Sequence, residues 1–262
     1  MGRLKITSRE YKIVLNHQLF EARKQAIEMF SEDLHNFTRS IPKTSVEGKF
    51  EPHDDREITF LDTVSNTVNL NGLLLRERRH LNTKRLEYTL KCRSPDRYLA
   101  ADGIGRTTEN RNETLKFEED IATPFVSRFS RSNTIGRVSE RPKTLGEAAK
   151  LFPKLLGLFR DGRKCDSDTK LEKVSSIRVH ERVYKGVVFS LCDTKAECAL
   201  IFWSNGKNGR SLIGEFSFRY GQKDERFNSS VSIAAMSIYQ RLLKSDWFIP
   251  DSETKTQFMY CC

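Results

Sequence analysis

The stretch LLLRERRHLNTKRLEYTLKCR, residues 73–93, decides the fold. It holds two runs that alternate like β-strands, at 73–80 and 85–93, separated by a short polar connection. A short connection favours antiparallel pairing of the two strands. Successive side chains of a strand point to opposite faces, so each run sends its charged residues to one side of the sheet. These residues are Arg76 and Arg78 in the first run and Glu87, Lys91 and Arg93 in the second.

The same spacing of charges recurs in four other strand-like segments. Any one of them could be the solvated face of an ordinary sheet, which most alternating strands have. Six such segments, with cations grouped in pairs and triplets, instead favour a site for a polyanion that also holds metal-binding carboxylates. The further positions are Glu10 and Lys12, then Lys116, Glu118 and Asp120, then Arg178, His180 and Arg182, and finally Glu215 and Arg219.

These segments belong to a larger pattern of eight or nine mostly antiparallel strands, with amphipathic helices predicted at 18–37, 145–159 and 231–244. A long sheet with one charged face tends to curl and close, because closure removes exposed edges. We therefore expect an α+β fold: a closed or nearly closed eight-stranded antiparallel β-barrel, or tunnel, covered by peripheral helices. No fixed repeat or clear linker divides the chain, which predicts a single domain over 1–262. The segment 122–143, rich in Ser, Arg and Thr, is predicted as a mobile loop near the tunnel mouth or an ordinary surface connection.

The charge balance points to an anionic partner. The chain has 262 residues, of which 31% are charged, and a net charge of +10. This excess alone does not choose among a nucleotide, inorganic polyphosphate, nucleic acid and an acidic membrane. Nucleic acid is disfavoured, because Trp203 and Trp247 sit in apolar segments and the sequence lacks a patch of aromatics interleaved with arginines.

The chain is predicted to be cytoplasmic. No apolar run approaches the roughly 20 residues of a membrane-spanning helix, and the first residues lack the apolar core of a signal peptide. The six cysteines form no C-x-x-C pair, which favours reduced thiols over a disulfide framework or a zinc site. The terminal pair Cys261 and Cys262 resembles a double-prenylation tail, which remains an alternative.

A charged tunnel of this kind suits a triphosphate. Several cations are needed to offset the dehydration of its phosphates, and the arginine fork binds phosphate with two hydrogen bonds. Carboxylates in the same cavity would repel the ligand unless a divalent cation such as Mg²⁺ or Mn²⁺ stood between them. The alternative is that the acids only neutralise neighbouring cations as ion pairs. The candidate phosphate-binding residues are Lys12, Arg76, Arg78, Lys91, Arg178 and Arg182, and the candidate metal-facing acids are Glu10, Glu118, Asp120, Asp193 and Glu215.

An ordered series of motifs along nearly the whole chain resembles the CYTH, or triphosphate tunnel metalloenzyme, superfamily. The E-x-E-x-K motif of that family is similar to residues 8–12, SREYK, and its G-x-x-L-R-x-R strand is similar to residues 72–78, GLLLRER. Further similar elements are TLK at 89–91, FEED at 117–120, the basic positions Arg178 and Arg182, LCD at 191–193, GEFS at 214–217 and TKTQF at 254–258.

The resemblance implies a tunnel that binds a triphosphate together with one or two divalent metal ions. The implied activity is metal-dependent hydrolysis of a phosphoanhydride bond in inorganic triphosphate, thiamine triphosphate or a nucleotide, and cyclisation of ATP also occurs in the family. In this interpretation Glu118 or Asp120 orients the attacking water, and Mg²⁺ or Mn²⁺ is the cofactor. The implied metal ligands are Glu10, Asp193 and Glu215.

Two positions depart from the family pattern. Ser8 stands where the first Glu of E-x-E-x-K is expected, and Ser217 stands where the second Glu of the last E-x-E is expected. Serine is a weak neutral ligand, so the loss of two carboxylates should lower the affinity for metal. The alternative function is therefore a catalytically degenerate module that binds triphosphate or polyphosphate without cleaving it.

Overall fold

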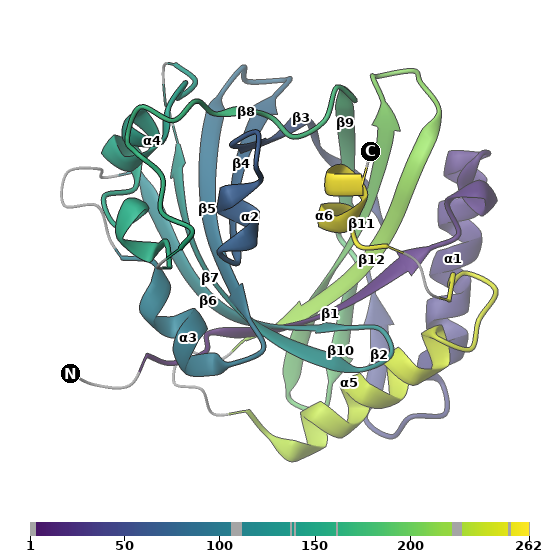
Figure 1. The fold of residues 1–262 in the computed structure, drawn as a ribbon. Helices are drawn as coiled ribbons and strands as arrows, with labels where there is room; N and C mark the ends of the chain where they lie inside the picture. The colour runs from purple at the N-terminus through teal and green to yellow at the C-terminus, as the bar shows by residue number, and fades with distance from the viewer. Residues whose placement is uncertain are drawn as a thin grey trace.

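The computed structural model describes residues 4–105, 112–136, 138, 140–160, 162–221, 227–250 and 253–261. Within them, nine strands close into a ring (Figure 1), in the order β12, β1, β6, β7, β5, β4, β3, β9, β11 and back to β12. The ring strands are β1 (Ser8–Leu15), β3 (Glu51–Asp62), β4 (Leu73–His80), β5 (Leu86–Ser94), β6 (Glu113–Ala122), β7 (Val126–Gly136), β9 (Val179–Lys185), β11 (Thr194–Asn205) and β12 (Ser211–Tyr220).

The predicted α+β barrel is confirmed, but the number and direction of its strands differ from the prediction. We expected eight antiparallel strands, whereas the ring has nine among the described residues, and β1 runs parallel to β6. The other neighbouring pairs in the ring are antiparallel. The parallel pair has a simple cause, because an odd number of strands cannot alternate in direction all the way around a closed ring.

The additional strand is β7, which occupies half of the segment 122–143. The prediction of a loop is therefore wrong for Val126–Gly136, which pairs with β6 on one side and β5 on the other. Positions 137 and 139 lie outside the described residues. The outward side of this strand includes the polar residues Arg131 and Asn133, which interrupt the apolar alternation by which strands are recognised, and its lumen side carries only polar side chains. These side chains are Arg128, Ser130, Ser132 and Thr134.

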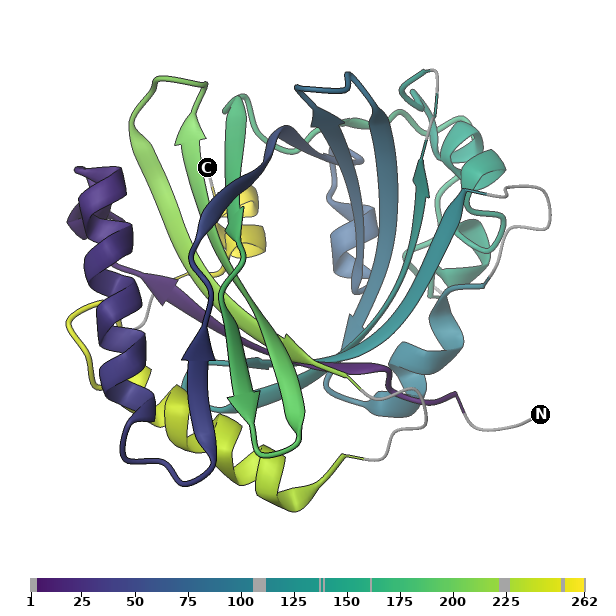
Figure 2. The ribbon, with the colours of Figure 1, turned by 180° about the vertical axis from the view of Figure 1, so that it is seen from behind.

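Helices cover the outside of the ring on two sides (Figure 2). On one side, α1 (Arg23–Thr38) and α5 (Ser229–Leu242) share an apolar core with the outer face of β1 and β12. Tyr11, Phe30 and Phe218 are among the buried residues of this core. The helices predicted at 18–37 and 231–244 are thus present in the structure, with somewhat different ends.

On the other side, α4 (Leu145–Leu151) packs against the outer face of β4 and β5, where Leu75 and Tyr88 are buried. The helix predicted over 145–159 is shorter than expected and continues as the 3₁₀ turn η2 (Leu156–Leu158). The remaining elements are η1 (His17–Phe20), β2 (Thr44–Glu47), α2 (Thr67–Leu70), α3 (Arg97–Gly103), β8 (Glu172–Lys173), β10 (Val188–Leu191) and α6 (Lys255–Cys261).

The last helix, α6, lies inside the ring (Figure 1). Met259 of α6 is buried in an apolar cluster with the lumen-facing residues Ile58, Phe60 and Trp203. Tyr260 donates a hydrogen bond of 2.9 Å to the carboxylate of Asp62 at the end of β3. Apolar packing therefore fills part of the lumen beside β3, β9 and β11.

Among the described residues, none of the helices combines the length and the apolar character needed to cross a bilayer. The described cysteines are free thiols: Cys92, Cys165, Cys192, Cys198 and Cys261. Cys262, the second residue of the prenylation-like tail, lies outside the described residues.

Candidate functional site

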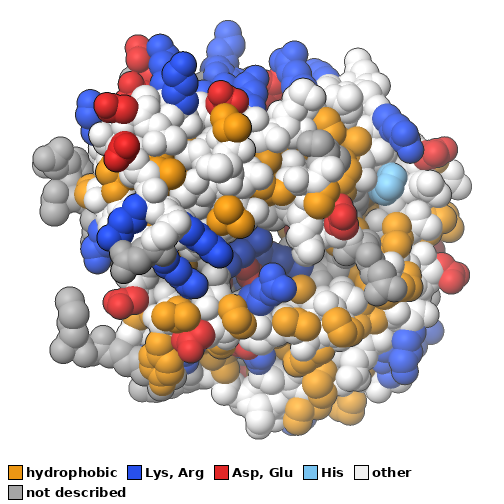
Figure 3. Space-filling model, in the orientation of Figure 1, with side chains coloured by type: hydrophobic (Ala, Val, Ile, Leu, Met, Phe, Trp, Pro, Cys, Tyr) orange, Lys and Arg blue, Asp and Glu red, His pale blue; other side chains and the backbone are white. Residues whose placement is uncertain are grey.

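Alternation along the strands gives the ring an apolar outer face and a charged lumen. On β1, Tyr11 is buried in the outer core, so Glu10 and Lys12 point inward. Figure 3 shows Lys and Arg side chains at the bottom of a hollow in the centre of one face of the molecule. The sequence-predicted residues that reach the lumen are Glu10, Lys12, Arg76, Arg78, Lys91, Glu118, Asp120 and Glu215.

Lys12 lies between two carboxylates at the contact of β1 with β6. Its Nζ is 3.0 Å from Glu10 Oε2 and 2.8 Å from Asp120 Oδ1. Burial lowers the pKa of the Lys12 ammonium, but Asp120 and Glu10 outweigh burial and raise that pKa above its ordinary value. One ammonium thus pairs with two carboxylates, which leaves one negative charge in excess among these three groups.

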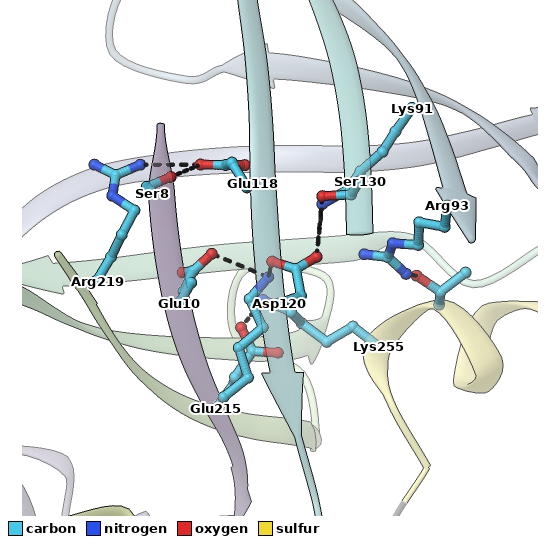
Figure 4. A network of polar contacts seen from close by, with 12 residues as sticks. Ser8, Glu10, Lys91, Arg93, Glu118, Asp120, Ser130, Glu215, Arg219 and Lys255 are labelled. Carbon is cyan, nitrogen blue, oxygen red and sulfur yellow. Dashed lines mark hydrogen bonds and ion pairs between the residues drawn. The ribbon is translucent and has the colours of Figure 1, made fainter. Parts of the chain in front are cut away.

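Lys91, from β5, approaches the same aspartate from the other side (Figure 4). Its Nζ donates a 3.1 Å hydrogen bond to Asp120 Oδ2. Burial, helped by the positive charges of Arg93 and Lys12, lowers the pKa of Lys91 to about 8, while Asp120 opposes this shift. Burial raises the pKa of Asp120, but Lys12 and Lys91 outweigh it and hold that pKa well below its usual range.

Ser8 faces Glu118 across the parallel pair. The Ser8 hydroxyl is 3.0 Å from Glu118 Oε1 and donates to it, and an Arg219 guanidinium nitrogen is 3.6 Å from the same oxygen. The position where the family motif has its first glutamate is therefore next to an acid already present in the lumen. Figure 4 shows these groups beside Glu10 and Asp120.

Two residues of α6 interact with charged groups of the tunnel. Lys255 Nζ lies 2.7 Å from Glu215 Oε1 and 5.7 Å from the centre of the Trp203 ring. Thr256 Oγ1 accepts a 3.2 Å hydrogen bond from Arg93. The candidate metal ligand Glu215 is thus paired with a lysine of the C-terminal helix.

A second charged region lies on β3 and β4. Arg56 is 2.7 Å from the buried carboxylate of Glu181, and Arg78 is 3.6 Å from Glu87. Arg76 has no hydrogen bond or ion pair to any residue in the part of the chain that the structure describes, and its Nε is buried. Burial and the neighbouring Arg78 lower the pKa of the Arg76 guanidinium well below its ordinary value. The acids of this region, which also include Asp54 at 3.4 Å from Arg56, pair with Arg56, Arg78 and His80, and none that the structure describes pairs with Arg76.

Three predicted site residues lie outside the lumen. Arg178 and Arg182 face outward, where they contact Glu57 and the carbonyl of Lys207 respectively. Asp193 is exposed in the turn between β10 and β11. The predicted set Arg178, His180 and Arg182 therefore lies on the face of its strand that points away from the lumen.

The reason lies in the apolar part of the tunnel. Apolar and basic residues alternate along β9, so the pattern alone does not say which set points inward. In the structure Val179 packs in the lumen with Trp203 and Met259. The apolar positions of this strand therefore point inward together with Glu181, and its basic positions point outward.

The sequence interpretation missed Arg56 and Glu181 as lumen residues. A register shift between Pro52 and Asp54 interrupts the alternation of β3 just before Arg56, so parity counted from the sequence loses its meaning there. Lys255 carried a signal, since it belongs to the TKTQF motif, but the sequence does not show that its helix lies inside the ring.

The donor set gives partial support for a divalent metal. Glu10 and Asp120 converge on one cation, the Lys12 ammonium, which shows that a positive charge fits between them. In the described ranges, however, no three Asp, Glu, His or Cys side chains gather as metal ligands usually do. The remaining acids, Glu118 and Glu215, are held by other partners.

No family model and no curated protein matches the sequence. Solved structures match it over nearly its whole length. A candidate adenylyl cyclase from Hippeastrum, described as having a dominant triphosphatase activity, is 11% identical, covers 98% of this chain and 96% of its own, and has a TM-score of 0.45. A candidate adenylate cyclase from Bacillus halodurans is 15% identical, covers 97% of both chains and has a TM-score of 0.45.

A further candidate adenylate cyclase, from Vibrio parahaemolyticus, is 11% identical, covers 99% of this chain and 100% of its own, and has a TM-score of 0.38. All three are described as candidate adenylyl or adenylate cyclases, and the first of them also as a triphosphatase.

Proposed function

We propose that this chain is a divergent member of the CYTH superfamily whose tunnel takes up a triphosphate-containing ligand. The observation that carries the proposal is Arg76, a guanidinium that faces the lumen without a protein partner. Leaving a charge buried and unpaired costs several kcal/mol. An anionic ligand supplies the missing partner, and phosphate suits the arginine fork.

The cations around Arg76 define where the phosphates would lie. Arg78 is next to it on the same face of β4, and Lys91 follows on β5. Lys12 completes the set from β1, but it must exchange part of its contact with Glu10 and Asp120 for the ligand. The ligand therefore binds first at Arg76 and Arg78, because Arg76 has no ion pair to break among the described residues and the ion pair of Arg78 with Glu87 is long.

A melting-shift titration with tripolyphosphate tests the proposal. A ligand that binds only the folded state at 100 times its Kd stabilises it by about 2.7 kcal/mol, which raises the Tm of a domain of this size by roughly 5–10 °C. Arg76→Gln should abolish most of this rise, and Arg39→Gln, the same change on an exposed residue of the outer surface, should leave it intact. Equal shifts in wild type and Arg76→Gln would contradict the proposal.

A second candidate is metal-dependent hydrolysis of the bound triphosphate, and the convergence of Glu10 and Asp120 on one cation favours it. Mg²⁺ or Mn²⁺ at these acids, with Glu215 as a further ligand, would supply a Lewis acid for the phosphoryl group. Glu118, held by Ser8 and Arg219, is then placed to accept a proton from water. Release of phosphate from tripolyphosphate, ATP or thiamine triphosphate with either metal separates this enzyme from a module that only binds.

A further inference from the structure

A cavity of about 450 Å³ lies at the outer wall of the barrel, where β3, β4 and β9 meet the segment that leads from β8 into β9. Its volume falls in the range of sites for small molecules. β3 pairs with β9 as far as Ile58 opposite Val179, and with β8 at Leu61 and Asp62. Between these two contacts the chain leaves β3, and this departure opens the cavity.

The polar lining of the cavity is mainly basic. The side chains of outward-facing Arg79 and exposed Lys173 make no hydrogen bond or ion pair with any residue that the structure describes. Arg141 and Arg178 also line it, each bound to one carboxylate. The two carboxylates, Glu77 and Glu57, leave the four cations in excess, and the hydroxyls of Thr59, Ser175 and Ser176 add further polar groups.

The floor of the cavity includes Met259 of α6. The side chain of Met259 is buried with Trp203 in the apolar cluster of the lumen. Four residues earlier on the same short helix, Lys255 pairs with Glu215 in the tunnel. A molecule in the outer cavity would therefore contact α6, the helix whose Lys255 pairs with Glu215.

We propose that this outer cavity is a second anion site, which binds a phosphate-bearing small molecule through Arg79 and Lys173 and contacts α6 at Met259. Two unpaired cations, with two further guanidiniums held at fixed positions by Glu57 and Glu77, match the charge and the hydrogen-bonding pattern of a phosphate group. The site lies on the face of the wall opposite the charged lumen, so it does not depend on the function proposed for the tunnel.

The methyl group of Met259 offers a direct probe, because the chain has only four methionines. Protein labelled with ¹³C at the methionine methyls is titrated with inorganic pyrophosphate, and the Met259 signal is identified with Met259→Leu. We expect a saturable shift of this signal. In Arg79→Gln/Lys173→Gln the apparent Kd should rise at least about tenfold, since each charged hydrogen bond contributes about 1.5–3 kcal/mol.

Two controls separate the outer cavity from other sources of the shift. Lys150→Gln/Lys154→Gln removes the same charge from two exposed residues in and just after α4, which do not line the cavity, and should leave the titration unchanged. Arg76→Gln weakens the tunnel and should also leave it unchanged. The proposal is overturned if wild type gives no saturable shift, if the Arg79 and Lys173 variants, single or double, titrate like wild type, or if Arg76→Gln abolishes the shift.

Discussion

The tunnel has two charged regions that differ in how their charges are balanced. Where β1 meets β6, each charge has a partner, and Lys12 alone neutralises parts of Glu10 and Asp120. On β3 and β4 the pairing is uneven: Arg56 pairs with both Glu181 and Asp54, Arg78 is only loosely paired, and Arg76 pairs with no acid in the part of the chain that the structure describes. The first region contributes to stability without a ligand, whereas the second becomes fully satisfied only when an anion binds.

The largest effect should come from breaking the balanced region. Among the described residues, Asp120 is the only acid that contacts both Lys12 and Lys91, so Asp120→Asn leaves two cations buried side by side. Removing one partner of a buried ion pair costs about 3–5 kcal/mol. Urea denaturation should show this loss in the free energy of unfolding.

The matched control is Asp193→Asn, in the exposed turn between β10 and β11, which should change that free energy by less than about 0.5 kcal/mol. If Asp120→Asn lost no more stability than the control, the first region would not be a balanced network at all.

The opposite pattern is expected in the second region. Arg76→Gln should weaken tripolyphosphate binding about 10- to 100-fold, because hydrogen bonds to charged groups contribute about 1.5–3 kcal/mol. The free protein should lose no stability, because the unpaired cation makes no contact that the substitution removes. Calorimetric titration and urea denaturation of the same sample give both quantities, and a loss of stability without a loss of affinity would reverse the comparison.

Adding carboxylates to the first region should raise its affinity for a divalent metal ion. Ser8→Glu places a carboxylate beside Glu118, and Ser217→Glu places one across from Lys12 on the neighbouring strand. We expect the double variant to bind Mn²⁺ at least about tenfold more tightly, since carboxylate oxygens are the preferred ligands. Ser8→Gln/Ser217→Gln has nearly the same size without the charge and should not gain affinity. Unchanged Mn²⁺ affinity and phosphate release in the glutamate variant would show that the two serines do not occupy metal-ligand positions.

The sequence allowed the first region and half of the second to be predicted, because parity along an uninterrupted strand fixes which side chains share a face. Glu10 with Lys12 and Arg76 with Arg78 follow this rule. The alternation of residues along a strand shows which side chains share a face, but it does not show which face points into the lumen, as β9 illustrates. Its apolar side chains face the lumen because α6 fills that part of the tunnel, a contact between segments about 75 residues apart in the chain that no local pattern contains.

The failure to predict Arg56 and β7, in contrast, has local causes. The register shift in β3 lies just before Arg56, and the outward side of β7 is interrupted by Arg131 and Asn133, so no regular apolar alternation marked this strand inside 122–143. The fold class was therefore predictable from the sequence, while the strand number and the placement of the basic residues of β9 were not.

The smallest effect, and the one that joins the two regions, is the pH dependence of Lys91. Its pKa of about 8 lies below the ordinary value of 10.5. Above pH 8 the lysine loses its charge, so the affinity for tripolyphosphate, taken relative to Lys91→Met, should fall about tenfold between pH 7 and pH 9.

The stability of the free protein should move in the other direction. Between pH 8 and 10.5 the unfolded chain binds more protons at this position than the folded chain, so the free energy of unfolding relative to Lys91→Met rises with pH. Affinity that falls while stability rises is the signature of a cation that the fold keeps buried for a ligand. If both quantities were flat across this window in wild type and variant alike, Lys91 would belong wholly to the balanced region, and Arg76 and Arg78 would be left as the cations available to an incoming anion.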